Sequence, residues 1–246
     1  MKGMSERYAR QIRLPEIGVK GQRKLAEASV LVIGAGGLGA PVLQYLTAAG
    51  VGSLDIMDGD TISASNLNRQ ILFGADDLHK NKAISSIQKL KQLNGEVELT
   101  AIPEMLSDEN ADRFVREHSA IVLCTDSITV RRAANRACVT ANVPFVDAAV
   151  DGFRGTVLTV IPHVTPCYEC VHAFSSLKQE TVPILGAMAG WVGCAEALAV
   201  IRLLLGLNEP SLGTILFFDG AEMTVEPVSI AINPKCDVCG AGLFLD

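Results

Sequence analysis

A glycine-rich turn in the first fifth of the chain has the composition of a phosphate-binding site. Residues 34–39 read GAGGLG, directly after the apolar run at residues 30–33 and before a stretch of helical periodicity. Glycines at Gly34, Gly36, Gly37 and Gly39 let backbone approach a phosphate closely, and amides at a helix N-terminus point toward the anion. The segment predicts a nucleotide site without specifying which nucleotide.

An acidic residue follows the turn at the distance that a ribose site requires. Asp58 stands nineteen residues after Gly39, at the end of the next apolar run, where a carboxylate accepts a hydrogen bond from a ribose hydroxyl. The spacing favours an unphosphorylated ribose, as in ATP or NAD. The alternative readings are a plain strand-to-helix turn for the glycines and a solvated loop acid for Asp58.

Two C-x-x-C pairs have the spacing of metal ligands. Cys167 and Cys170 form the first pair, and Cys236 and Cys239 form the second. Four thiolates fill a tetrahedral zinc site and leave no open position for water or substrate, so we expect a structural Zn²⁺. A redox dithiol or a disulfide is the alternative, less favoured for matched pairs in a reducing compartment.

Composition and charge argue against nucleic-acid binding, secretion and a membrane segment. The chain has 246 residues, with 21 basic against 27 acidic side chains and a formal charge of -6, which argues against a nucleic-acid-coating surface. The N-terminus alternates charges and lacks the apolar core of a secretory signal. The longest uncharged stretch, residues 181–195, is too short to span a bilayer. We expect a cytoplasmic protein without a membrane segment.

Alternation of short apolar runs with helical stretches predicts an α/β fold. The predicted class is a Rossmann-like, mostly parallel sheet with helices on both faces, followed by a C-terminal antiparallel β extension and a zinc knuckle. The helix near residues 187–205, whose charges are Glu196 and Arg202, should be largely buried. Expected strands lie at 30–33, 54–57, 97–101, 120–124 and 144–150, expected helices at 38–49, 80–94, 107–118 and 129–142, and the β-rich runs at 156–161, 214–218 and 224–232.

Longer motifs separate the nucleotides. The stretches MDGDTISASNLNRQILF, HKNKA and CTDS, with RYARQ near the start and the two cysteine pairs near the end, resemble the MoeB, ThiF and HesA group of bacterial ubiquitin-activating-like adenylyltransferases. The resemblance covers nearly the whole chain. It implies a single adenylating domain over residues 1–246, with an N-terminal arm at 1–28, a nucleotide-binding half at 29–150 and a carrier-binding half with the zinc site at 151–246.

The resemblance also implies roles for individual side chains. Arg10 would reach into the site of a partner subunit in a homodimer. The remaining implied contacts are the ribose for Asp58, the nucleotide for Asp60, the ATP phosphates for Asn66, Arg69 and Lys82, and Mg²⁺ for Asp126.

General chemistry is consistent with these roles. Attack of a carboxylate on the α-phosphorus of ATP places negative charge on oxygens that nearby cations and amides stabilise, and Arg10, Arg69 and Lys82 are cations of that type. A terminal carboxylate, whose ordinary pKa is about 3.5, is ionised at neutral pH and needs no general base. The four histidines of the sequence follow no catalytic spacing. Each charged residue taken alone also fits an ordinary surface or turn position.

The implied function is adenylylation of the C-terminal Gly-Gly carboxylate of a small ubiquitin-like sulfur-carrier protein, releasing pyrophosphate. Sulfur transfer for molybdopterin, thiamine or a related pathway would follow, with a cysteine desulfurase or a rhodanese as a possible sulfur donor. Alternatives are an enzyme that adenylates a peptide or a tRNA-linked carboxylate, an NAD-dependent oxidoreductase, and a non-catalytic carrier-binding domain.

Two positions depart from the family pattern. Many members carry a carrier-accepting cysteine in the crossover loop, where this chain has Val182 and no other cysteine within residues 179–190. We therefore expect no stable covalent link to the carrier. Ser127 replaces the asparagine usual after the CTD motif, which leaves the details of the phosphate or magnesium contacts open.

Overall fold

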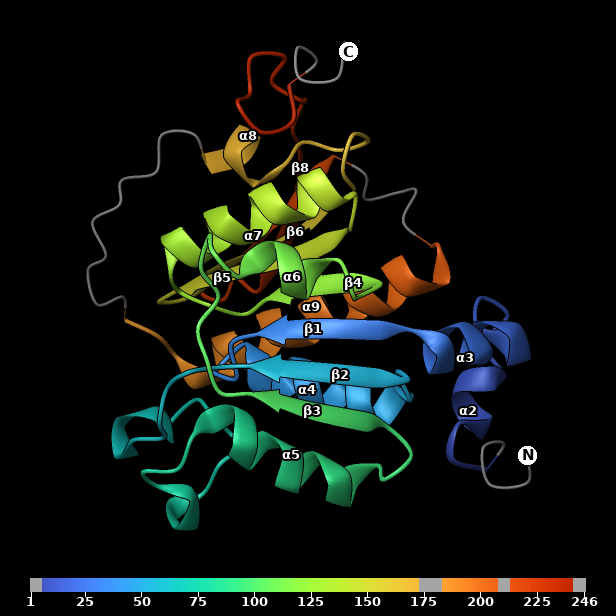
Figure 1. Cartoon of the computed structure of the whole chain (residues 1–246), viewed down its shortest axis with the longest axis vertical. Helices are drawn as coiled ribbons and strands as arrows, with labels where there is room; N and C mark the ends of the chain where they lie inside the picture. The colour runs from blue at the N-terminus through green and yellow to red at the C-terminus, as the bar shows by residue number, and fades with distance from the viewer. Residues whose placement is uncertain (1–5, 173–182, 208–212, 241–246) are drawn as a thin grey trace.

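The computed structural model describes residues 6–172, 183–207 and 213–240. Within these ranges one eight-stranded sheet has the order β3-β2-β1-β4-β5-β6-β7-β8 (Figure 1). The first five strands are parallel, and β6, β7 and β8 continue the same sheet in antiparallel fashion. The predicted fold class is confirmed. The strands are β1 Ser29–Ile33, β2 Ser53–Met57, β3 Glu98–Ile102, β4 Ala120–Leu123, β5 Phe145–Asp151, β6 Arg154–Val160, β7 Thr214–Asp219 and β8 Thr224–Ser229.

Helices cover both faces of this sheet. On one face lie α4 Gly39–Ala49, α5 Lys82–Leu93 and α9 Gly186–Leu205; on the other lie α6 Ala111–Val115 and α7 Ile128–Ala141. The short helices α2 Ala9–Ile12 and α3 Gly18–Glu27 sit beside the amino ends of the strands (Figure 1). Helix α8 Tyr168–His172 and the 3₁₀ turns η1 Ala64–Asn66 and η2 Ala75–Asp77 complete the described elements.

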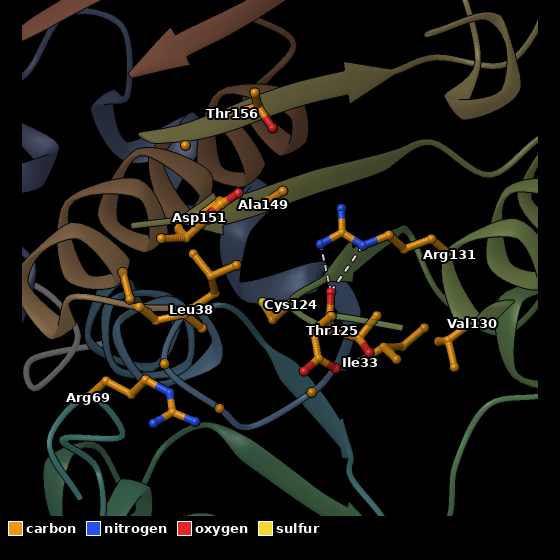
Figure 2. A pocket seen from close by; sticks show the side chains of 18 of the residues that line it. Ile33, Leu38, Arg69, Cys124, Thr125, Val130, Arg131, Ala149, Asp151 and Thr156 are labelled. Atoms are coloured by element: carbon orange, nitrogen blue, oxygen red, sulfur yellow. Dashed lines mark hydrogen bonds between the residues drawn. The ribbon is translucent and has the colours of Figure 1, made fainter. Parts of the chain in front are cut away.

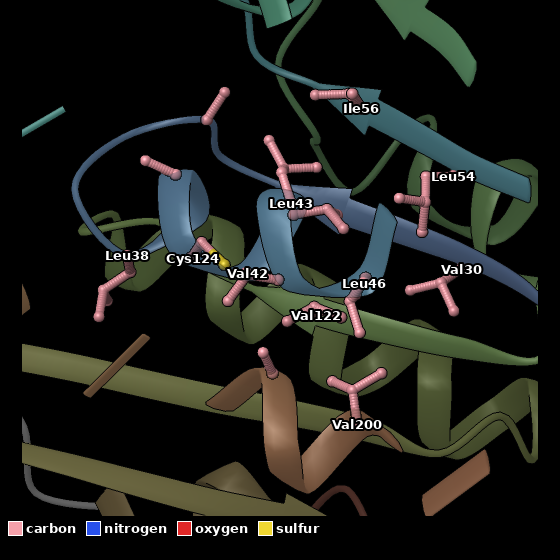
Figure 3. Packing of buried hydrophobic residues seen from close by; sticks show 14 of the residues in the cluster. Val30, Leu38, Val42, Leu43, Leu46, Leu54, Ile56, Val122, Cys124 and Val200 are labelled. Atoms are coloured by element: carbon pink, nitrogen blue, oxygen red, sulfur yellow. The ribbon is translucent and has the colours of Figure 1, made fainter. Parts of the chain in front are cut away.

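Alternation along the strands divides the core into two layers. Val30 and Val32 of β1 face α4 and α9, whereas Leu31 and Ile33 face α6 and α7. Figure 3 shows the first layer, in which α4 side chains pack between the sheet and Val200 of α9. A strand buried on both faces must be apolar at successive positions, and β1 is apolar from its second residue onward.

Helix α9 is less buried than we expected. By length and composition it could cross a membrane, yet it packs on α4, β5 and β6 of this domain. Of its most apolar 18-residue stretch, only 44% is buried. Trp191 and Cys194 are half-buried, and Leu198 is 58% exposed. Among the described residues, the side chain of Leu198 therefore stays mostly uncovered on the outer side of α9.

The helix predicted for residues 107–118 is shorter than expected. The backbone N–H of Ser107 donates to the side chain of Asn110, and the helix itself, α6, begins only at Ala111. The side chain of Asn110 thus satisfies a backbone donor in a turn at the start of the predicted helix. The other predicted elements of the parallel half occur with ends shifted by one or two residues.

The strand order reverses direction beside β1, which has β2 on one side and β4 on the other. The connections after β1 and β4 leave the sheet toward opposite faces, since α4 and α7 lie in different layers. Ligands of open α/β sheets bind in the crevice that such a divergence opens at the carboxyl ends of the strands. The fold therefore places a binding crevice just beyond Ile33 and Leu123.

Candidate functional site

A cavity of about 1240 Å³ lies at this crevice and collects most of the predicted site residues (Figure 2). It extends from the glycine turn after β1 to the open face of β5–β8. The predicted residues that line it are Gly34, Gly36, Gly37, Asp58, Asp60, Asn66, Arg69, Lys82 and Asp126.

Close approach of backbone to backbone explains the glycine turn. Gly34 has φ +100°, and a Cβ there would lie 2.6 Å from the carbonyl oxygen of Cys124. A Cβ at Gly39 would overlap the carbonyl oxygen of Gly34, so Gly39 permits the packing of α4 against the turn although it does not itself line the cavity. The turn can bend this tightly only with glycine at both positions.

Asp58 is held by the glycine turn. Its Oδ2 accepts a hydrogen bond from the N–H of Ala35 at 2.8 Å, and its Oδ1 accepts one from the N–H of Asp60 at 2.9 Å. Burial raises the pKa of Asp58, while Lys82 and the two N–H donors oppose this rise. The carboxylate thus stands fixed between the turn and the loop after β2.

Lys82 places a buried cation at the same end of the cavity. The residue is 7% exposed, and its Nζ lies 2.8 Å from Oδ2 of Asp60 and 4.0 Å from Oδ2 of Asp58. Lys82 is the first residue of α5, which Asn81 caps by accepting from the N–H of Ile84. The amide of Asn81 also donates to the carbonyl oxygens of Asp58 and Asp60, so this cap ties the helix to the loop that carries both acids.

The loop after η1 brings a second cation to the cavity. Arg69 is half-buried, and its Nη1 donates to the carbonyl oxygen of Ser65 at 3.0 Å and to Oδ1 of Asn68 at 3.1 Å. Asn66 accepts from the N–H of Ser63 and thereby closes the 3₁₀ turn. A Cβ at Gly37 would lie 3.4 Å from Cγ of Arg69, so the arginine passes directly over the glycine turn.

Two further polar residues of the cavity were not predicted. Gln70 is 4% exposed, its Oε1 is buried without a hydrogen-bond partner, and its Nε2 lies 3.7 Å from where a Cβ of Gly36 would be. Arg131 of α7 also lines the cavity. Gln70 lies within the motif that carries the family resemblance, whereas Arg131 precedes a second arginine in an ordinary helical pattern and gives no signal in one sequence.

Arg131 organises the loop that carries Asp126. Its Nε and Nη2 donate to the carbonyl oxygen of Thr125 at 3.0 and 2.6 Å, as the dashed lines of Figure 2 mark. Its Nη1 donates to both carboxylate oxygens of Asp147. The cap of α7 is Ser127, whose Oγ accepts from the N–H of Val130, so Asp126 is not the capping residue. Asp126 is exposed at the cavity wall.

Arg10 lies elsewhere. It is exposed on α2 and is not among the residues that line the cavity. In Figure 1, α2 lies beside the amino ends of the strands, whereas the glycine turn follows the carboxyl end of β1. Arg10 therefore sits at the opposite end of the sheet from the cavity of its own chain.

The cavity continues over two cross-strand rows of the antiparallel extension. The strand register aligns Ala149, Thr156, Phe217 and Glu226 in one row, and Asp151, Arg154, Asp219 and Thr224 in the next. All eight residues line the cavity. We call these two rows the open floor. On the opposite face, α9 packs on β5 and β6, and Phe218 of β7 stacks edge-to-face on Trp191 with ring centroids 5.2 Å apart.

The four predicted zinc ligands form one cluster. Sγ atoms of Cys167, Cys170, Cys236 and Cys239 lie within 4.8 Å of one another, although 69 residues separate the pairs Cys167–Cys236 and Cys170–Cys239. Tetrahedral Zn–S bonds of about 2.3 Å place sulfurs about 3.8 Å apart. The sulfurs of these two pairs are 3.7 and 3.4 Å apart, which is close to that spacing.

Donors around this cluster fit thiolate ligands. Asn135 Nδ2 lies 3.7 Å from Sγ of Cys167, and the N–H of Asn233 lies 3.4 Å from Sγ of Cys170. Such N–H donors orient metal-bound sulfur and stabilise its charge. The sulfur geometry and its donors therefore fit a four-coordinate zinc ion.

Comparisons with known proteins identify relatives of this chain. The ThiF family matches residues 8–238 of the chain. The mouse adenylyltransferase and sulfurtransferase MOCS3 is 42% identical over 242 residues; this chain spans about half of that protein, 52% of its length. The Escherichia coli sulfur carrier protein ThiS adenylyltransferase is 37% identical, with 95% of this chain and 94% of that protein covered. The Haloferax volcanii SAMP-activating enzyme E1 is also 37% identical, with 96% and 89% covered.

A solved structure shares the fold. The crystal structure of E. coli MccB with MccA-N7isoAsn has a TM-score of 0.86 and 27% identity, and the match covers 96% of this chain and 75% of that one. Because the family match extends over nearly the whole chain and relatives of similar length exceed 30% identity, this protein belongs to the ThiF family.

Proposed function

We propose that this chain adenylylates the C-terminal carboxylate of a ubiquitin-like sulfur carrier with ATP. Its curated relatives include sulfur carrier protein adenylyltransferases that this chain covers almost completely. The observation that supports this proposal most directly is that Gly34, Arg69 and Lys82 line one cavity, which continues onto an open sheet face. The first part provides amides and cations for a triphosphate, and the second provides room for a polypeptide tail.

The reaction needs charge stabilisation and no proton transfer. A carboxylate oxygen of the carrier attacks the α-phosphorus, a new P–O bond forms, and the bond from the α-phosphorus to its bridging oxygen breaks. The electron pair leaves with pyrophosphate. Arg69, Lys82 and the amides of the glycine turn would hold the phosphate oxygens on which charge accumulates, and Asp58 would hold the ribose. No described histidine lines the cavity, which suits a nucleophile that is already ionised.

Two metal ions belong to the proposal. Asp126, on the cavity wall, would hold Mg²⁺, which supplies positive charge to the phosphates and to the leaving pyrophosphate. Zn²⁺ at the four cysteines would be structural, since four sulfurs leave no coordination position open. It would join α8 to the segment after β8 and would not enter the reaction.

The carrier would use the second half of the chain, residues 151–246. Its tail would cross the open floor toward the α-phosphate, because the floor is the part of the cavity not framed by the glycine turn and the cations. Val182 lies outside the described residues. On the sequence alone, we propose that an external sulfur donor, such as a cysteine desulfurase or a rhodanese, attacks the acyl-adenylate.

A homodimer with Arg10 acting across the interface is the second element of the proposal. Arg10 lies at the wrong end of the sheet for its own cavity, and α9 exposes the apolar side chain of Leu198 among the described residues. Tyr45 of α4, which packs against α9, is 55% exposed. We place the dimer in the cytoplasm.

Carrier-dependent ATP–pyrophosphate exchange tests the proposed reaction. The wild-type chain is assayed with ubiquitin-like carriers that end in Gly-Gly and with the same carriers truncated by the last glycine. Exchange stimulated only by the intact carriers supports the proposal. Stimulation by short peptides alone, or by a charged tRNA, would instead assign a non-protein substrate, and hydride transfer to NAD would contradict the proposal outright.

Subunit mixing tests the dimer. Arg10→Ala and Lys82→Ala variants are each expected to be almost inactive, whereas a random mixture should regain about a quarter of wild-type exchange, because half of the dimers contain one complete site out of two. A mixture no more active than its parents would show that Arg10 serves its own chain or no site.

A further inference from the structure

The sheet end of the cavity is acidic. At the nucleotide end, the cations Arg69 and Lys82 are interspersed with Asp58, Asp60 and Asp126. The charged side chains at the other end, on β5–β8 and their turns, are mostly acids. Four carboxylates line the cavity there against one guanidinium, and they are Asp151, Asp219, Glu222 and Glu226 against Arg154.

Among the residues that the structure describes, one cation of this extension lies beside these acids. Arg154 is 84% exposed at its side chain, and its Nε lies 4.0 Å from Oδ2 of Asp219, a weak surface contact. The other oxygen of Asp219 accepts from the N–H groups of Ala221 and Glu222 and fixes the turn that presents Glu222. Among the described cavity-lining residues of this extension, the acids therefore keep an excess of negative charge.

The same surface has an apolar centre. Phe217, in the row between Thr156 and Glu226, is 45% exposed, although aromatic side chains in this sheet are otherwise buried against helices. Two residues further along the same face, Leu158 and Ile215 are buried in the core layer that contains α7 and α8. Within the part of the chain that the structure describes, the floor is thus an open sheet face with a central aromatic ring and an acidic rim.

The dimensions of the floor fit a short extended segment. From β5 to β8 there are three strand spacings of about 4.8 Å each, or roughly 14 Å, which an extended chain crosses in about four residues. A polypeptide whose last two residues reach the α-phosphate would therefore lay roughly its third to sixth residues from the carboxyl end across the floor.

We propose that the open floor selects carriers whose tail is basic at the residues just before the terminal pair, with a small apolar residue over Phe217. This inference rests on the proposed function and specifies the chemistry of its partner. Lysine or arginine at those positions meets the acidic rim, whereas a glutamate-rich tail is repelled by it. Nucleotide phosphates are likewise kept off the floor, because its acids repel them.

Charge-series peptides test the inference. Three fluorescent seven-residue peptides end in Gly-Gly and differ only at the fourth and sixth positions from the carboxyl end, which carry lysine, glutamine or glutamate. Their affinity for the chain is measured by anisotropy with a non-hydrolysable ATP analogue present. The lysine peptide should bind at least ~10-fold more tightly than the glutamate peptide at low salt, and this ratio should shrink as salt is added.

Charge reversal on the protein is the experiment that matches the peptide series. A double variant with Asp219→Lys and Glu226→Lys should reverse the order of the peptides, whereas Glu98→Lys on the exposed start of β3 should keep it. Equal affinities, no binding by any peptide, or an unchanged order in the double variant would overturn the inference. Carrier-dependent exchange by the wild-type chain, measured in parallel, keeps that failure distinct from a failure of the proposed function.

Discussion

The guanidinium of Arg131 donates from Nη1 to both carboxylate oxygens of Asp147, at 2.8 Å each, with the two side chains 7% and 1% exposed. The pair joins the first turn of α7 to β5. Because the same guanidinium also holds the carbonyl oxygens of Thr125 and Ala148, it fixes the β4–α7 loop on the cavity wall. A fully satisfied buried ion pair is costly to break on one side only.

Asp147→Asn should therefore lower the free energy of unfolding by about 3–5 kcal/mol, because it leaves the buried guanidinium of Arg131 without its negative partner. Urea unfolding followed by circular dichroism measures the change. The control is Asp108→Asn, which breaks the exposed pair with Arg136 and should cost less than about 1 kcal/mol. Equal losses in the two variants would show that burial does not set the strength of the Arg131 pair.

Glu196 should make stability depend on pH. Its side chain is fully buried on α9, Oε2 accepts from Sγ of Cys124, and Oε1 has no partner. Burial, with the nearby charge of Asp147 adding to it, raises the pKa of Glu196 well above its usual value. The folded protein thus keeps a proton that the unfolded chain releases once pH exceeds about 4.5. The contribution of Glu196 to the free energy of unfolding therefore falls as pH rises above about 4.5.

The variant Glu196→Gln has no carboxyl group at this position, so its free energy of unfolding should lack this dependence on pH. The difference in unfolding free energy, wild type minus variant, should decrease as pH rises above 5, by at most about 1.4 kcal/mol per pH unit. Urea titrations at pH 5, 6, 7 and 8 measure it. Acids present in both proteins, such as Asp58, largely cancel in the difference. A difference that stays constant over this range would mean that Glu196 is ionised in the folded state.

Replacing a cysteine of the four-sulfur cluster should reduce zinc binding and thermal stability before it reduces exchange activity. Cys170→Ser and Cys239→Ser should each lose bound zinc and melt at lower temperature, because metal binding contributes directly to folding. Cys194→Ser, at a half-buried site on α9 outside the cluster, is the control and should keep full metal content. Mass spectrometry of the metal and thermal unfolding give the two readouts. A variant that folds normally without zinc yet loses all exchange would assign the metal a catalytic role.

The two cations should act mainly on the rate of exchange, and neither substitution should remove zinc. Arg69→Ala and Lys82→Ala should each lower ATP–pyrophosphate exchange by about 10²–10³-fold, the usual effect of removing one stabilising donor. Zinc content should stay unchanged, since the cysteine cluster is built on other elements. Lys91→Ala, on the exposed side of the same helix α5, is the matched control for Lys82. Wild-type exchange in both variants would remove the phosphate assignment.

Local signals predicted the nucleotide half of the fold well. The glycine turn, Asp58 and the helix that starts at Lys82 each carry a pattern within a few residues, and the structure brings them to one cavity. The assigned roles stay predictions. The four cysteines were also grouped correctly by spacing, since C-x-x-C pairs constrain a ligand set without knowledge of the intervening chain.

Features that depend on tertiary contacts were not predictable. The pairing of Arg131 with Asp147 joins a helix to a strand, and neither residue stands in a local motif. The open floor arises from register across four strands, which a single sequence does not display. The exposed face of α9 was missed because composition gives a helix's apolarity but not what covers it. The short α6 reflects a side-chain contact of Asn110 with the backbone of Ser107, which forms a turn where the helix was predicted to begin.

Transfer of the α-phosphate is the most direct measurement of the proposed chemistry. The chain is incubated with a Gly-Gly carrier and ATP labelled either at the α- or at the γ-phosphate, and the carrier is then isolated under acid. We predict that the α-label stays with the intact carrier while the γ-label leaves as pyrophosphate, and that both outcomes are lost with Arg69→Ala. Label transferred from the γ-phosphate, or pyrophosphate release without any carrier, would contradict the proposed adenylylation.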